Sequence, residues 1–279
     1  MSVVFRLNRL ASRWFWLGVV VVWAPLGWAQ SSLVQDIPSR DGVTQRVLWV
    51  QAPQAKGVMV VMPGGHGGMQ ISDRGAIQWG ETIFFVRNRE ALARQGVHVL
   101  VVDAPSDKQK PPYLNGHRQR PDHVTDLRAV IRWAREQTGL PVWLAGFSRG
   151  THSAAYYALQ TGDSEDAPDA VVLAASILSD KPPTRTVPDK PLERIKVPVL
   201  WVHHEQDSCQ FCPYAMLKPA MDKAVNVPVQ ALLSYTGGTD HTDTCGPLGY
   251  HGFRQLESDV EKDIIAWLLA NAPRRQKGS

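Results

Sequence analysis

The sequence lacks a hydrophobic run long enough to cross a membrane. Its N-terminal apolar run, Trp14 to Ala24, is well short of the roughly 20 residues that a transmembrane helix needs. Three arginines precede this run, and the small residues Gly27 and Ala29 follow it before a polar stretch. The pattern is typical of a secretory signal. We therefore interpret residues 1–29 as a signal peptide and expect a periplasmic or secreted protein, with an uncleaved anchor as the alternative.

Basic clusters interleaved with aromatic residues are also missing beyond this leader. The leader holds three arginines and no acidic residue, so its removal lowers the formal net charge from +4 to +1. No basic patch interleaved with aromatic residues remains, and nothing favours nucleic acid or an anionic membrane surface as a partner. Residues 30–279 have a suitable length for a single α/β domain with a sizeable core. The sequence does not indicate an oligomeric state.

Cysteine is scarce: the chain has three, all in its last third. Cys209 and Cys212 have the spacing of one ligand pair for zinc, but a tetrahedral structural site needs a second pair, which Cys245 alone does not supply. Export would place these residues in an oxidising compartment, where a disulfide persists. We therefore expect no metal and one disulfide, between Cys209 and Cys245, with Cys212 as the alternative partner of Cys245.

Buried strands and helices alternate along the chain. Apolar runs rich in valine predict buried strands at 57–62, 97–102, 142–147, 170–175, 197–204 and 229–235. Helical spacing is found at 82–95, from 122 to before 139, after 150, at 214–223 and at 255–270. Early strands near 33–37 and 43–50 are expected outside the parallel core. The alternation predicts an α/β fold with a mostly parallel central sheet and helices on both faces. The loop at 180–196 is too short for a large cap domain.

The most informative stretch is Gly146-Phe147-Ser148-Arg149-Gly150, between the strand at 142–147 and an alanine-rich helix. In a strand–turn–helix context, Gly-x-Ser-x-Gly holds the serine in a strained turn and exposes its hydroxyl at the end of the strand. This context favours Ser148 as a nucleophile over a serine in a simple connecting turn. A serine hydroxyl also needs a base, and the base needs a group that orients it.

Chain order limits the candidates for acid and base. In hydrolases of this layout the order is serine, acid, histidine, and functional groups gather where parallel strands end. Asp207 follows the strand at 197–204 and is the preferred acid, with Glu205 and Asp180 as alternatives. His251, just before the last helix, is the preferred base because a disulfide from Cys245 would draw its loop toward the acid. His241 is the alternative base.

Acyl transfer also requires donors for a developing oxyanion. The backbone N–H after the nucleophile, that of Arg149, is the first candidate, and Gly65 in the glycine-rich turn Pro63 to Gly68 is the second, with His66 as its alternative. No lysine follows this turn as in a phosphate-binding loop, and we expect no cofactor. Polar residues after neighbouring strands either line the mouth of the pocket or form caps and surface pairs: Asp103, Asp107, Arg118, Asp122 and His123.

With these motifs, the chain resembles the α/β-hydrolase superfamily over nearly its whole length after the leader. It is similar to small exported bacterial serine hydrolases of the dienelactone-hydrolase-like and esterase group, which lack a large cap domain. The resemblance implies a Ser148–His251–Asp207 triad, with Gly65 and Arg149 holding the oxyanion. Dienelactone hydrolases use cysteine where this chain has Ser148, so the resemblance does not carry over their substrate.

These observations predict a hydrolase acting on a small-molecule ester with a small or medium acyl group. The same triad cleaves amides, so a peptidase or amidase is an alternative. A different class is a non-catalytic exported binding protein that keeps the fold, because a fold does not determine function. The triad positions are all filled by residues competent for catalysis, which favours the enzyme.

Overall fold

The computed structural model describes residues 32–179, 186–187 and 189–273, and the predicted signal at 1–29 lies outside them. An eight-stranded sheet has the order β1-β2-β4-β3-β5-β6-β7-β8. The strands are β1 (Ser32–Arg40), β2 (Val43–Val50), β3 (Gly57–Met62), β4 (Val97–Val102), β5 (Val142–Phe147), β6 (Ala170–Ala174), β7 (Val199–His204) and β8 (Gln230–Tyr235). Strands β3 to β8 are parallel, whereas β1 and β2 pair antiparallel at one edge. The mostly parallel sheet that the sequence predicts is confirmed, as is the position of the early strands outside the parallel core.

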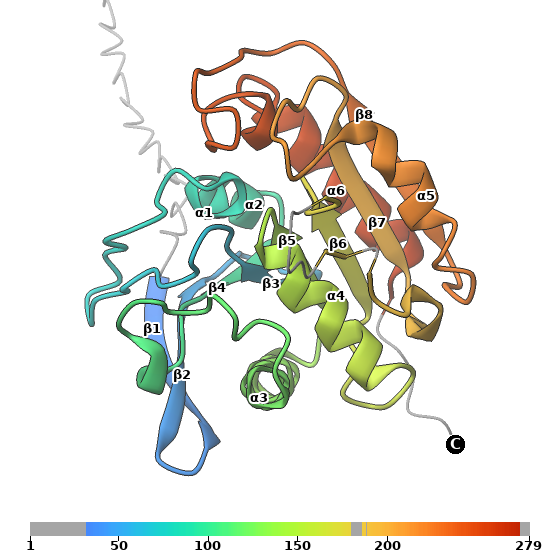
Figure 1. The fold of residues 1–279 in the computed structure, drawn as a ribbon. Helices are drawn as coiled ribbons and strands as arrows, with labels where there is room; N and C mark the ends of the chain where they lie inside the picture. The colour runs from blue at the N-terminus through green and yellow to red at the C-terminus, as the bar shows by residue number, and fades with distance from the viewer. Residues whose placement is uncertain (1–31, 180–185, 188, 274–279) are drawn as a thin grey trace, which may run out of the picture.

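The helices lie on both faces of the sheet (Figure 1). They are α1 (Phe84–Arg87), α2 (Arg89–Arg94), α3 (Pro121–Thr138), α4 (Gly150–Thr161), α5 (Leu217–Met221) and α6 (Glu257–Asn271), with short 3-10 turns at Ser106–Lys108, Leu192–Arg194, Tyr214–Met216 and Tyr250–Gly252. Side chains of α3, α4 and α5 share one core cluster, and those of α1, α2 and α6 share the other. The strands supply both clusters because successive side chains point to opposite faces. In the described chain no helix is long and apolar enough to span a membrane.

One predicted helix is broken in the structure. The continuous helix predicted at 82–95 is two short helices, α1 and α2, that meet at Asn88. Three consecutive side chains, those of Phe84, Phe85 and Val86, are buried in the core. One stripe of a straight surface helix does not cover three consecutive positions, so this turn is embedded in the core on more than one side.

The parallel strands bring distant segments of the chain to one edge. Met62 at the end of β3 pairs in register with Gly146 near the end of β5, and β7 pairs with β8 up to His204 and Tyr235. The turns that follow these strands carry the glycine-rich turn, Ser148, Asp207 and the long segment that contains His251. The residues of the predicted triad and oxyanion hole therefore all come from the carboxyl edge of the sheet, where open parallel sheets bind ligands.

Candidate active site

Ser148 occupies a strained turn between β5 and α4. Its φ angle is 51°, in the left-handed region that non-glycine residues seldom adopt, and its N–H donates to the carbonyl of Ala174 at 2.9 Å. The flanking glycines are needed sterically. A Cβ on Gly150 would lie 1.9 Å from the carbonyl oxygen of Met62, and one on Gly146 would lie 2.6 Å from that of Gly150. Ser148 itself is partly exposed, at the end of β5.

Asp207 and His251 form a buried pair. Nδ1 of His251 lies 2.9 Å from Oδ2 of Asp207, and the side chains are 1% and 0% exposed. The other carboxylate oxygen of Asp207 accepts the N–H of Cys209 at 3.0 Å. Nε2 of His251 has no hydrogen-bond partner among the described residues, although it is buried. A histidine that a carboxylate orients through Nδ1, and whose Nε2 is available to accept a proton, has the arrangement of a general base.

The loop that carries His251 is held close to the serine turn. The ring of Phe147, the residue before Ser148, lies 5.2 Å from the imidazole of His251 between centroids. The guanidinium of Arg87 also holds this loop, donating to the carbonyls of Pro247 and Gly252 at 3.0 and 2.6 Å. These contacts place the base beside the strand end that presents Ser148.

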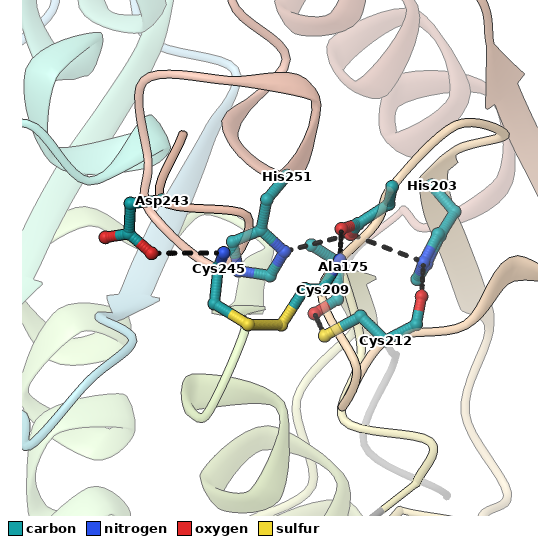
Figure 2. Close-up of a disulfide and its surroundings, with 8 residues drawn as sticks. Ala175, His203, Cys209, Cys212, Asp243, Cys245 and His251 are labelled. Atoms are coloured by element: carbon teal, nitrogen blue, oxygen red, sulfur yellow. Dashed lines mark hydrogen bonds and ion pairs between the residues drawn. A yellow bond between two sulfur atoms is a disulfide. The ribbon is translucent and has the colours of Figure 1, made fainter. Parts of the chain in front are cut away.

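A disulfide joins the two loops that supply Asp207 and His251. Cys209 and Cys245 are bonded, which confirms the predicted pairing, and Figure 2 shows the bond beside the His251 ring. Oδ1 of Asp243 accepts the N–H of Cys245 at 3.3 Å, which further orders this loop. The link thus connects a residue two positions after the acid to one six positions before the histidine.

Cys212 is a buried free thiol in the same region. Its Sγ donates to the carbonyl of Ala175 at 3.3 Å, and burial raises the pKa of this thiol well above its usual value. Cys212, Cys209 and His251 lie close enough together to suggest metal ligands. However, the sulfur of Cys209 is bonded to Cys245 and the thiol of Cys212 stays protonated, so this group does not offer the two thiolates that zinc takes.

A second histidine, His203, also lies near the acid and was not among the sequence candidates. Its Nε2 lies 3.6 Å from Oδ2 of Asp207, beyond hydrogen-bond distance, and 2.8 Å from the carbonyl of Cys212. Burial lowers the pKa of His203, so the ring is neutral at neutral pH. His203 lies close to Asp207 because the two residues are four positions apart across the end of β7. No sequence pattern distinguishes this spacing.

The glycine-rich turn after β3 packs directly against the serine turn. A Cβ on Gly64 would lie 3.1 Å from Cβ of Ser148 and 3.1 Å from the carbonyl oxygen of Phe147. The N–H groups of Gly65, His66 and Arg149 donate to no acceptor among the described residues. These are the two predicted oxyanion donors and the alternative to one of them.

The alternative acid and base are placed differently. His241 is exposed, and its Nδ1 accepts the N–H of Asp243 at 3.1 Å within its own loop. Glu205 is exposed and accepts the hydroxyl of Ser234 at 2.6 Å. Asp180 lies outside the described residues. Of the candidates that the structure describes, only Asp207 and His251 contact each other.

The polar residues expected at the mouth of the pocket, or in caps and surface pairs, have different surroundings in the structure. Asp107 pairs with Arg40 on the surface at 2.9 Å. Asp103 is buried and accepts the N–H groups of Met69, Gln70 and Ile71, so it holds the segment after the glycine-rich turn. Arg118, in contrast, is buried against the glycine-rich turn.

The chain was compared with known proteins. No protein-family model matches it, and no curated protein matches its sequence. Among solved structures, a Pyrococcus furiosus esterase superposes with a TM-score of 0.62 at 13% identity, covering 95% of this chain and 98% of the esterase. A dienelactone hydrolase from Anabaena variabilis superposes with a TM-score of 0.60 at 12% identity, covering 87% of this chain and 99% of the hydrolase.

A third similar structure comes from Xanthomonas campestris and is described as an α/β serine hydrolase without a lid. It superposes with a TM-score of 0.53 at 16% identity, covering 85% of this chain and 94% of that protein. Identities this low show the fold alone. The chain has the α/β-hydrolase fold, as the sequence predicts.

Proposed function

We propose that this protein is a serine hydrolase that cleaves a carboxylic ester with a small or medium acyl group through an acyl-enzyme. The observation that carries the proposal is the buried His251, whose Nδ1 is bonded to Asp207 and whose Nε2 has no partner among the described residues. A histidine whose Nδ1 is held by a buried carboxylate keeps Nε2 available to take a proton, as a general base must. The neighbouring strained Ser148 supplies the hydroxyl that such a base would activate.

The proposed reaction has two stages. Nε2 of His251 takes the proton of Ser148 as Oγ bonds to the acyl carbon, and the carbonyl π pair moves onto the oxygen. The N–H groups of Gly65 and Arg149 donate to this oxyanion. The electron pair on the oxyanion then re-forms the carbonyl, and the bond between the acyl carbon and the alkoxide oxygen breaks. His251 gives its proton to the departing alkoxide, which leaves as an alcohol. A water molecule then repeats both steps, which releases the carboxylic acid and restores Ser148. Asp207 orients His251 and stabilises its charged form.

The proposed setting is the periplasm or the exterior of the cell. We assign residues 1–29 to a signal and the remaining chain to a single hydrolase domain. The disulfide between Cys209 and Cys245 supports this setting, since such bonds persist in oxidising compartments.

The test measures hydrolysis of p-nitrophenyl esters over a range of acyl lengths, with matched p-nitroanilides to compare amide cleavage. We expect Ser148→Ala and His251→Ala to lower kcat by at least about 10⁴-fold. His241→Ala is the matched control, because His241 is exposed and is bonded only within its own loop, and it should keep wild-type turnover. A wild-type protein that hydrolyses no ester and takes no fluorophosphonate label would contradict the proposal and favour a binding protein.

A further inference from the structure

Arg118 is a buried arginine without a carboxylate partner among the described residues. It is 4% exposed, whereas the partly buried arginines of the described chain pair with acids, as Arg87 does with Glu257. Burial, followed by the nearby charge of Arg149, lowers the pKa of Arg118 to about 9, so the side chain remains a cation at neutral pH. A buried unpaired charge destabilises a fold unless hydrogen bonds compensate it, and its presence therefore calls for an explanation.

The guanidinium of Arg118 is directed at the carbonyl oxygens of the glycine-rich turn. Its Nη2 donates to the carbonyls of Pro63, Gly64 and Gly65 at 2.9, 3.3 and 3.2 Å. The next carbonyl, that of His66, accepts the N–H of Leu114 at 3.0 Å from the same segment. Four successive carbonyls thus face residues 114–118.

This arrangement fixes the direction of the N–H groups of the same peptides. In a trans peptide the carbonyl of one residue and the N–H of the next point in opposite directions. The carbonyls of Gly64 and Gly65 that bond Arg118 therefore belong to the peptides that carry the N–H groups of Gly65 and His66. Both N–H groups point away from Arg118, and Gly64 lies against Ser148.

The other end of the guanidinium is bonded to the helix that follows Ser148. Nη1 of Arg118 donates to Oγ of Ser153 at 3.0 Å, and Ser153 lies in the first turns of α4. Oγ of Ser153 also lies 2.9 Å from Nε2 of His123 on α3, whose pKa is lowered well below its usual value by burial and by Arg118. One side chain thus connects the turn that carries Gly65 with the helix whose N-cap is Arg149.

We propose that Arg118 is a positioning residue of the oxyanion hole, which sets the N–H groups of the glycine-rich turn relative to that of Arg149 and places a positive charge behind them. This inference rests on the proposed function. Gly67 makes room for this side chain, because a Cβ there would lie 2.5 Å from Nη2 of Arg118. The cation polarises the peptides in the direction that strengthens their N–H groups as donors, and an effect of this kind acts most strongly on a negative transition state.

The experiment compares Arg118→Met, Arg118→Lys and Ser153→Ala in the full protein. We expect Arg118→Met to lower kcat by about 10²–10³-fold, as the loss of an oxyanion donor does, with KM changed only a few-fold. Arg118→Lys keeps the charge but not the planar fork, and an intermediate loss is expected. Arg120→Met is the matched control: Arg120 is exposed, two residues further along, and should leave kcat unchanged.

A second readout separates positioning from a general structural role. An alkyl trifluoromethyl ketone forms a tetrahedral adduct with an active serine and carries an oxyanion, so its affinity should fall in parallel with kcat in each variant. Unchanged kcat and ketone affinity in folded Arg118→Met would overturn the inference and leave the hydrolase proposal intact. If that variant does not fold, wild-type kcat and ketone affinity in both Arg118→Lys and Ser153→Ala would overturn it. An inert, unlabelled wild type would overturn both proposals.

Discussion

The N–H of Cys209 donates to the carboxylate oxygen Oδ1 of Asp207 at 3.0 Å, and Cys209 is in turn bonded covalently to Cys245. Cys209 therefore has two roles: it holds the carboxylate that orients His251, and it links the loop of Asp207 to the loop of His251. We predict that reduction of the disulfide loosens both loops and lowers activity together with stability.

The size of the stability loss follows from the closed loop. The bonded cysteines are 36 residues apart, and the loop entropy of such a link corresponds to about 3–4 kcal/mol. Thermal unfolding and ester hydrolysis with and without dithiothreitol measure both effects. Cys212→Ser is the control, since Cys212 is the free thiol and this variant should respond to reductant as the wild type does. An unchanged melting temperature and activity in reductant would contradict the prediction.

The two acidic residues after β7 should differ sharply in function. Asp207→Asn leaves the side-chain shape but removes the charge that orients His251, and kcat should fall by about 10⁴-fold. Glu205→Gln alters an exposed contact with Ser234 and should leave kcat within twofold of the wild type. Steady-state kinetics on the two purified variants test the assignment. Equal losses in both would show that the acid has been assigned wrongly.

Replacing Gly150 by alanine should destabilise the protein far more than the same change at Gly42, a glycine with no close neighbours. A Cβ on Gly150 would lie 1.9 Å from the carbonyl of Met62, so Gly150→Ala must push β3 and α4 apart, at a cost of about 3 kcal/mol or more. At Gly42 a Cβ meets nothing within 4 Å, and only the positive φ of 66° opposes Gly42→Ala, at about 1–2 kcal/mol. Urea unfolding gives both values. Similar losses would show that the elbow relaxes more readily than its contacts imply.

The sequence predicts both the sheet and the contact between Asp207 and His251, because both follow from the pattern of buried parallel strands. Continuous valine-rich runs are typical of strands buried on both faces, and β3 has the predicted bounds, Gly57–Met62. Parallel strands end at one edge, so Asp207 after β7 and His251 after β8 are brought together although 44 positions separate them.

Other features depend on tertiary contacts that no local pattern encodes. The break at Asn88 depends on the burial of Phe84, Phe85 and Val86 together, and this burial is a property of the packed core. The role of Arg118 depends on carbonyls more than fifty positions earlier in the chain. From the sequence, an arginine in a polar loop is indistinguishable from a surface residue.

The last prediction concerns stability and pH. Glu261 on α6 is 3% exposed, and burial, followed by the charge of Glu257, raises its pKa from 4.5 to about 7. The folded protein therefore keeps a proton on Glu261 that the unfolded chain loses above pH 4.5. Its unfavourable contribution is absent below pH 4.5, grows as the pH rises, and is complete above about pH 7.

Glu261→Gln should remove this penalty, since the amide is neutral at every pH and its oxygen can still accept the hydrogen bond from Gln95. At pH 8 we expect a gain of about 3–4 kcal/mol in the free energy of unfolding, at about 1.4 kcal/mol for each unit of the pKa difference, and no gain at pH 4. Glu257→Gln is the opposing control. Its carboxylate pairs with Arg87 and has a lowered pKa, so this change should destabilise the protein at pH 8. Urea unfolding of both variants at pH 4, 6 and 8 tests the sign, and a gain for Glu261→Gln that did not grow with pH would show that folding does not raise the pKa of Glu261.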